Sequence, residues 1–182
     1  MKIWKGLLIL VAAGQLAIPA TMIRQRELTL RDGHVYKFRT QPVDPYDAFR
    51  GRFVALRLEP NTAPVASNAT FERGATVYVA LAEGPDGFAK FTGASREQPV
   101  GQDYLKVKAY SSGGATVSVQ LPFDRFYMEE KAAPAAERAY REHSRQGGER
   151  DAYVIVRVRD GQGVIENLYV DGQPIAEFGR AH

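Results

Sequence analysis

The chain contains no cysteine in its 182 residues. This absence excludes disulfide bonds, thiolate nucleophiles and cysteine-based metal sites. Histidine is scarce as well, because only His34, His143 and His182 occur, and no two of them have metal-ligand spacing. The sequence also has no Gly-x-Ser-x-Gly elbow, no Walker loop and no dinucleotide-binding glycine pattern. We therefore expect no metal and no cofactor, and these absences favour a role other than catalysis.

A strong excess of charge of one sign is missing too. The formal net charge is +3, and two of the basic residues, Lys2 and Lys5, lie within the first 23 residues, where no acidic residue occurs. Beyond residue 23, 22 basic residues face 21 acidic ones. Such a balanced surface does not favour nucleic acid as a partner. The roughly 160 residues that follow the apolar N-terminus match one domain of ordinary size.

The N-terminus holds the longest uncharged stretch of the chain. Residues 6–23, GLLILVAAGQLAIPATMI, form an eighteen-residue run without charge, a length that just crosses the hydrocarbon core of a bilayer. Lys2 and Lys5 precede the run and Trp4 suits the membrane interface, which favours an orientation with the N-terminus inside the cell. The sequence predicts a membrane anchor over residues 1–23 and an outward-facing, extracytoplasmic domain over residues 24–182.

The alternative for this segment is a cleaved signal peptide, which needs small residues at positions −3 and −1 of the cleavage site. Cleavage after Ala20 would place Ile18 at −3, and cleavage after Thr21 would place Pro19 there. Neither residue suits that position, so an uncleaved transmembrane helix is the preferred interpretation.

The remainder of the chain has the pattern of a mainly β protein. Strand-length runs alternate with turn signals, which predicts a single antiparallel β-rich domain with one substantial helix. Asp32-Gly33 predicts a hairpin between residues 28–30 and 35–39, and Gly161-Gln162-Gly163 predicts another between residues 151–159 and 164–170. Further strands are expected at residues 52–58, 76–81, 87–91, 104–109 and 115–121.

One segment outside the N-terminus is typical of a helix. Residues 129–146 are rich in Ala, Glu and Arg, with Gly147-Gly148 beyond their end. Pro134 marks the expected start, because proline suits a first helical turn. Residues 61–70 are expected to form an exposed loop.

Several residue pairs could carry hydrolytic chemistry. Asp44 with Asp47 and Glu129 with Glu130 are paired carboxylates, as a hydrolase would require. The Asp44 segment also resembles a turn, and adjacent glutamates favour the start of a helix, so a structural role is the preferred interpretation. The serines at 111 and 112 lie near Lys106 and Lys108, but a turn beside a solvated strand explains them better than a catalytic dyad.

Residues 42–58, PVDPYDAFRGRFVALRL, carry the most specific pattern. They resemble the GDYXXLXY family of bacterial membrane-anchored proteins, whose motif follows a DPxDxxRG lead-in. The positions that match are Asp44, Pro45, Asp47, Arg50, Gly51 and Leu56. The sequence departs from the motif at Arg52, Phe53 and Leu58, which replace an aspartate and two tyrosines.

A second segment, RFYMEE at residues 125–130, looks like another stretch of the same family, and the closing GVIENLYVDGQPI also looks familial. The resemblance therefore covers nearly the whole chain. The residues that the two segments offer as a binding site are Asp44, Asp47, Arg50, Gly51, Phe53, Leu56, Arg125, Tyr127 and Glu130. We expect the proline-framed lead-in to serve chiefly the local conformation, with a groove between the two segments as the functional alternative.

The resemblance implies a bacterial protein with its anchor in the inner membrane and its domain in the periplasm. It also implies that the protein occurs alongside multi-pass membrane proteins, and it implies no established activity. The leading hypothesis is a binding or scaffolding domain that its anchor presents to a membrane protein or another envelope component. The alternatives are an envelope hydrolase that uses the carboxylates of the DPxD and RFYxEE segments, and an edge-strand adaptor for an extended peptide. Convergence of the two segments in a polar pocket with paired carboxylates would favour the hydrolase.

Overall fold

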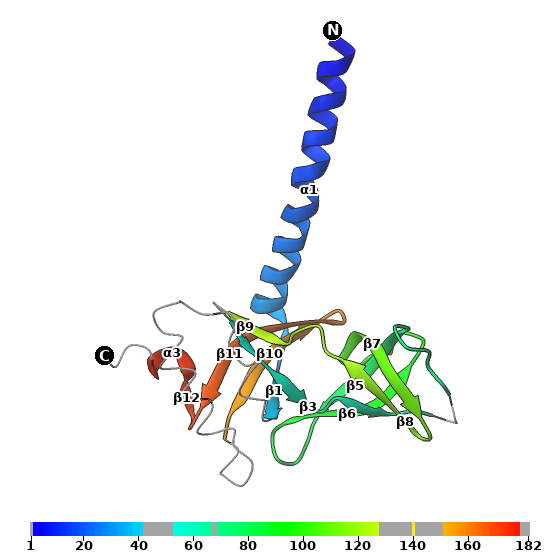
Figure 1. Cartoon of the computed structure of the whole chain (residues 1–182), viewed down its shortest axis with the longest axis vertical. Helices are drawn as coiled ribbons and strands as arrows, with labels where there is room; N and C mark the ends of the chain where they lie inside the picture. The colour runs from blue at the N-terminus through cyan, green and yellow to red at the C-terminus, as the bar shows by residue number, and fades with distance from the viewer. Residues whose placement is uncertain (1, 42–52, 67–68, 128–139, 141–150, 179–182) are drawn as a thin grey trace.

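The structure is a computed structural model, and it describes residues 2–41, 53–66, 69–127, 140 and 151–178. A single helix, α1 (Lys2–Asp32), projects from a β-rich body, and its N-terminus lies far from the strands (Figure 1). This helix is long and apolar enough to cross a membrane, and none of its most apolar window is buried against the body. The expected N-terminal apolar helix is therefore present.

The helix extends beyond the predicted anchor boundary at residue 23. It continues to Asp32, so the predicted strand at residues 28–30 and the hairpin at Asp32-Gly33 are wrong. The residues at 24–31 are mostly Arg, Gln, Glu and Leu, which are good helix formers. Gly33 ends the helix, and its N–H donates to the Thr29 carbonyl at 3.0 Å. A Cβ at Gly33 would collide with that carbonyl oxygen.

The first sheet has the strand order β12-β11-β10-β1-β3, and all of its pairings are antiparallel. Its members are β1 (His34–Gln41), β3 (Arg57–Glu59), β10 (Tyr153–Arg159), β11 (Gln162–Val170) and β12 (Gln173–Pro174), followed by the short helix α3 (Ile175–Phe178). The predicted hairpin of β10 and β11 is confirmed, although its turn is Asp160-Gly161. Both turn residues have positive φ, at 50° and 79°, as a type I′ hairpin turn requires.

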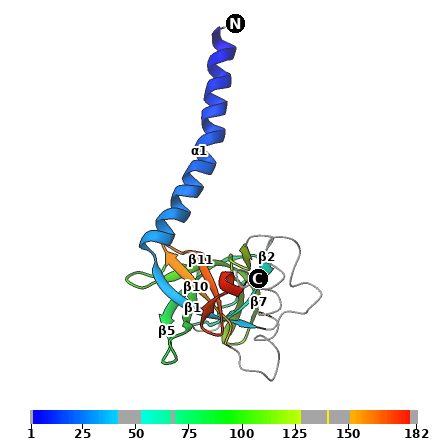
Figure 2. The same cartoon turned by 90° about the vertical axis from the view of Figure 1, so that its left-hand side faces the viewer.

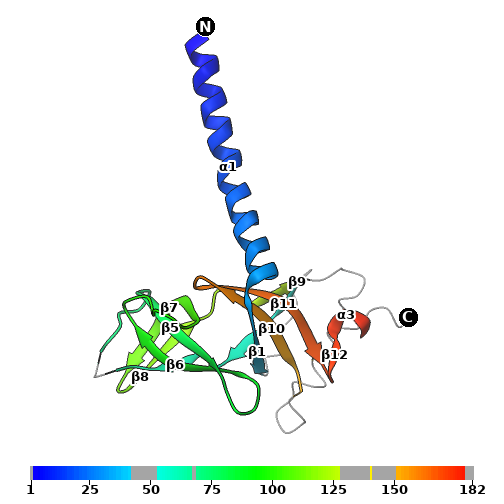
Figure 3. The same ribbon diagram turned by 180° about the vertical axis from the view of Figure 1, so that it is seen from behind.

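The second sheet has the order β4-β8-β7-β5-β6. Its members are β4 (Thr62–Pro64), β5 (Thr76–Glu83), β6 (Ala89–Ser95), β7 (Tyr104–Gly113) and β8 (Thr116–Gln120). A parallel bridge between Val65 and Ala94 connects the two ends of this order, so the sheet curls back on itself. Figure 3 shows these strands grouped beside β1, β10 and β11.

The prediction of an exposed loop at residues 61–70 is wrong in part, because β4 lies within it. Ala63 is fully buried and Val65 nearly so. The run offered no strand pattern of its own, since the buried residues of β4 and its continuation, Ala63 and Val65, are small and lie among polar residues. The strand exists because β8 pairs with it, through Thr62↔Ser118 and Pro64↔Thr116.

The strand predicted at residues 52–58 is divided between two sheets. Its first part, β2 (Phe53–Ala55), pairs with β9 (Arg125–Tyr127) in a separate sheet, whereas β3 joins the first sheet. Leu56 lies between the two parts, where its side chain is buried and its N–H donates to the Asp124 carbonyl at 2.8 Å. The chain therefore changes sheets at Leu56, a change that alternation of side chains does not reveal.

One hydrophobic cluster spans both sheets. At its centre Phe38 of β1 is fully buried and meets Phe91 of β6 and Phe123 edge to face, with ring centroids 6.4 and 5.5 Å away. The expected mainly antiparallel β fold is confirmed. The helix predicted at residues 129–146 lies outside the described residues except for Tyr140, which is buried and donates to the Gln41 carbonyl at 3.5 Å.

Two polar contacts bind β1 to the second sheet. His34 Nδ1 lies 2.5 Å from Asp103 Oδ2, and the Tyr36 hydroxyl donates to the same carboxylate oxygen at 2.8 Å. Burial, followed by the hydrogen bond to Asp103, raises the pKa of Tyr36, so its hydroxyl keeps its proton. Asp103 precedes β7, so this cluster fastens the start of the domain, next to α1, to the second sheet.

Candidate functional site at the base of the N-terminal helix

The last turns of α1 are fixed on the hairpin of β10 and β11. Arg159 donates to Asp32 at 3.2 Å, and Gln162 Nε2 donates to Gln25 Oε1 at 3.4 Å. Thr29 is buried at this junction with 2% of its surface exposed. Figures 1 and 2 show the helix leaving the body beside β1, β10 and β11. These contacts fix the position of the C-terminal end of α1 on the domain.

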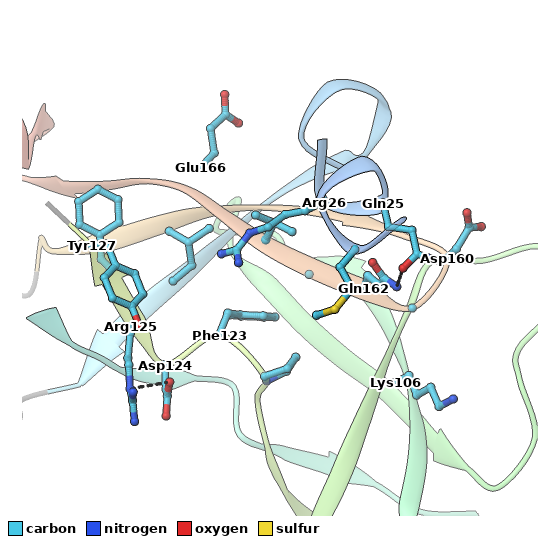
Figure 4. Close-up of a pocket in the computed structure, with 17 residues that line it drawn as sticks. Gln25, Arg26, Lys106, Phe123, Asp124, Arg125, Tyr127, Asp160, Gln162 and Glu166 are labelled. Carbon is cyan, nitrogen blue, oxygen red and sulfur yellow. Dashed lines mark hydrogen bonds and ion pairs between the residues drawn. The ribbon is translucent and has the colours of Figure 1, made fainter. Parts of the chain in front are cut away.

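A pocket with a volume of about 960 Å³ lies in the angle between α1 and the body. One wall is the helix, the second is the turn and first half of β11, and the third is β9 with the residues before it (Figure 4). The lining residues are Met22, Gln25, Arg26, Lys106, Pro122, Phe123, Asp124, Arg125, Phe126, Tyr127, Asp160, Gly161, Gln162, Gly163, Val164, Ile165 and Glu166.

The floor of this base pocket depends on two glycines. A Cβ at Gly163 would overlap the ring of Phe123, and a Cβ at Gly161 would overlap the ring of Tyr104. Gly161 also pairs with Leu105 and accepts a hydrogen bond from the Lys106 N–H at 2.8 Å. The hairpin can therefore lie directly against the second sheet, and near Gly163 the floor of the pocket includes backbone and the ring of Phe123.

The acidic side chains of the pocket all have cationic partners close by. Arg157 Nε lies 2.6 Å from Glu166, Arg159 lies 3.3 Å from Asp160, and Arg125 lies 3.6 Å from Asp124. The hydrogen bond to Glu166 raises the pKa of Arg157, so that this pair stays charged. The negative charges of the pocket are thus already balanced by neighbouring arginines.

Two cationic side chains of the pocket have no acidic partner among the described residues. Within the described parts of the chain, the side chains of Arg26 and Lys106 have no hydrogen-bonding or ion-pair partner. Figure 4 shows the Arg26 side chain directed from α1 into the space above Phe123, with Lys106 at the opposite rim. Among the described residues, the pocket therefore holds two cations that no acidic side chain balances, above the ring of Phe123.

The predicted site residues fall into three groups. Asp44, Asp47, Arg50, Gly51 and Glu130 lie outside the described residues. Leu56 contributes to the core, with 7% of its surface exposed. Phe53, Arg125 and Tyr127 lie together on the ribbon of β2 and β9, where Phe53 is opposite Tyr127 and Ala55 is opposite Arg125.

This pairing places residues 53–55 of the first familial segment beside residues 125–127 of the second, and Arg125 and Tyr127 also line the base pocket. Sequence reasoning missed Arg26, Phe123 and Gly163. An arginine within one turn of the end of the uncharged run was the available signal for Arg26. No local signal marks Phe123 or Gly163, because their contact joins distant parts of the chain.

The described contacts of Lys106 and Lys108 do not support a catalytic serine–lysine pair. Lys108 Nζ donates to Thr76 Oγ1 at 2.9 Å, and Lys106 lies at the rim of the base pocket. Among the described residues, no three His, Cys, Asp or Glu side chains are grouped as metal ligands would be.

Comparison with known proteins agrees with the resemblance seen in residues 42–58 and 125–130. The family model described as "GDYXXLXY protein" matches residues 15–168, which includes both segments, β1 to β10 and most of β11. No curated protein and no solved structure gives a significant match. Since the match extends over most of the sequence, the chain belongs to the GDYXXLXY family.

Proposed function

We propose that this protein is a membrane-anchored binding domain that acts in the periplasm on a membrane-embedded partner. In this proposal α1 crosses the inner membrane once with its N-terminus in the cytoplasm. The observation that carries the proposal is the position of the base pocket, whose walls include both the anchor helix and β9 of the second familial segment. Anything bound there contacts the anchor and the domain together.

The position of the pocket along α1 supports a site at the membrane surface. Met22 lies at the end of the uncharged run, and Gln25 and Arg26 follow within one helical turn. The nine residues after Ile23 span about 13 Å at the rise of an α-helix. The body of the domain would then lie against the headgroup layer, where its upper face can meet another membrane protein.

The ribbon of β2 and β9 is the surface we assign to the protein partner, which we expect to be a multi-pass membrane protein. Tyr127 is 62% exposed on this ribbon, and tyrosine is enriched at energetically important interface positions. In the described structure the ribbon contains only these two strands. Its short length favours side-chain contacts over capture of a long extended peptide.

A photo-crosslinking amino acid at position 127 tests the assignment in intact cells. We expect Tyr127 replaced in this way to form an adduct with an integral membrane protein. The matched control is Tyr110, which is 56% exposed and does not line the base pocket. Equal adducts at both positions, or none at position 127, would contradict the proposed partner surface.

A separate prediction concerns the retention of α1 as a membrane anchor. The full-length protein should stay with membranes after a wash at alkaline pH, and N-terminal sequencing should begin at Met1 or Lys2, because no suitable cleavage site follows residues 6–23. A mature chain that begins near Met22 would remove the helix wall of the pocket and refute the anchored arrangement.

A further inference from the structure

We propose that the base pocket binds the headgroup of an anionic phospholipid from the outer leaflet of the membrane that α1 crosses. The proposal rests on the anchoring and orientation stated under the proposed function, and names a ligand that is separate from the protein partner. It follows from the order of polarity along α1, the charges of the pocket and its volume.

The polarity of the helix wall matches the polarity of a lipid molecule. Met22 and Arg26 both line the pocket and are separated by four residues, so they lie on one face of α1 about 6 Å apart along its axis. The apolar residue is nearer the membrane interior and the cation is nearer the domain. A phospholipid has the same order, with its acyl chains deeper in the membrane and its phosphate at the surface.

The charges of the pocket select an anion. Asp124, Asp160 and Glu166 each lie beside an arginine, at 3.6, 3.3 and 2.6 Å. Arg26 and Lys106 make no side-chain hydrogen bond or ion pair with the residues that the structure describes. A guanidinium binds phosphate through two parallel hydrogen bonds. The guanidinium of Arg26 points into the space of the pocket (Figure 4).

The size of the pocket favours a lipid over a free ion. Its volume of about 960 Å³ is at the upper end of the usual range for small-molecule sites. Inorganic phosphate would occupy a small fraction of it and leave the exposed side chains of Met22 and Tyr127, which also line the pocket, in water. A glycerophosphate group with the first carbons of its acyl chains would cover those side chains.

Native mass spectrometry of the full-length protein, transferred from detergent micelles, tests the proposal. The lipid probes are phosphatidylglycerol and phosphatidylcholine, added separately at equal concentrations. We expect one phosphatidylglycerol to bind with clear preference over phosphatidylcholine. Arg26→Gln should weaken that binding about tenfold, as expected for loss of a charge-assisted hydrogen bond, and Arg26→Lys should weaken it less.

Arg24→Gln is the matched control, because it removes the same charge from the same turn of α1 and Arg24 does not line the pocket. Equal loss in Arg24→Gln and Arg26→Gln would show general surface attraction and overturn the site. Equal binding of the two lipids would overturn it as well. Displacement of the lipid by millimolar inorganic phosphate would assign the pocket to a free anion. Thermal unfolding of Arg26→Gln should match that of the unchanged protein, and selective loss of lipid with an unchanged melting curve supports the site.

The outcomes for the two proposals are separable. Lipid preference that depends on Arg26, without any adduct at Tyr127, would support the lipid site and refute the protein partner. An adduct at Tyr127 in a protein that binds both lipids equally would refute the lipid site and leave the partner assignment standing.

Discussion

Phe38→Ala is expected to lower the free energy of unfolding by about 3–5 kcal/mol, the usual cost of removing a fully buried phenylalanine ring. Phe38 has no exposed surface and meets the rings of Phe91 and Phe123. Its removal leaves a cavity where the two sheets join, and close-packed neighbours collapse only in part. The melting temperature should fall by about 6–20 °C for a domain of this size.

The measurement is thermal unfolding of the full-length protein in detergent, followed by the strand signal in far-ultraviolet circular dichroism. Val35→Ala is the control, because Val35 lies on the same strand with 48% of its surface exposed. This control should change the melting temperature by no more than a few degrees. A similar small change for Phe38→Ala would mean that the two sheets do not share one core.

Gly163→Ala is expected to cost about 1–3 kcal/mol, the range for overpacking a filled site. The new Cβ would meet two carbons of the Phe123 ring and a methyl carbon of Leu105. The ring cannot move away freely, since it is buried in the core and packs edge to face against Phe38. Because Phe123 also forms the floor of the base pocket, the substitution should weaken binding at the pocket as well as stability.

Gly93→Ala provides a matched comparison. Gly93 lies in β6, its φ is not in the left-handed region, and no atom lies within 4 Å of a Cβ built there. Alanine at such a position reduces the entropy of the unfolded chain, so the melting temperature should stay the same or rise slightly. Equal destabilisation by both substitutions would contradict the close approach of β11 to Phe123.

Local sequence patterns were sufficient for the apolar helix and for the long hairpin. The uncharged run at residues 6–23 needs only its composition to predict a helix in a membrane. In β10 the alternation of half-buried Tyr153 and Ile155 with buried Val154 and Val156 is visible as a β-branched run, and Asp160-Gly161 has the preferred chemistry of a two-residue turn. Both features depend on residues that are close in sequence.

The end of α1 shows where local patterns were insufficient. Asp32-Gly33 has the same chemistry as the hairpin turn at Asp160-Gly161, yet in the structure it ends a helix. The deciding contacts come from far along the chain, since Arg159 and Gln162 bind Asp32 and Gln25. An Asp-Gly pair makes several backbone conformations accessible, and the packing of neighbouring elements selects among them.

Sequence alone therefore determined the apolar N-terminal helix, the antiparallel β class, the family and the segments 42–58 and 125–130, because each is recorded in neighbouring residues. Tertiary structure decided the strand change at Leu56, the pairing of Phe53 with Tyr127, and the pocket that joins Arg26, Phe123 and Gly163. The physical reason is that these contacts join residues distant in sequence. Their formation depends on the shapes and charges of surfaces that exist only after both sheets have folded.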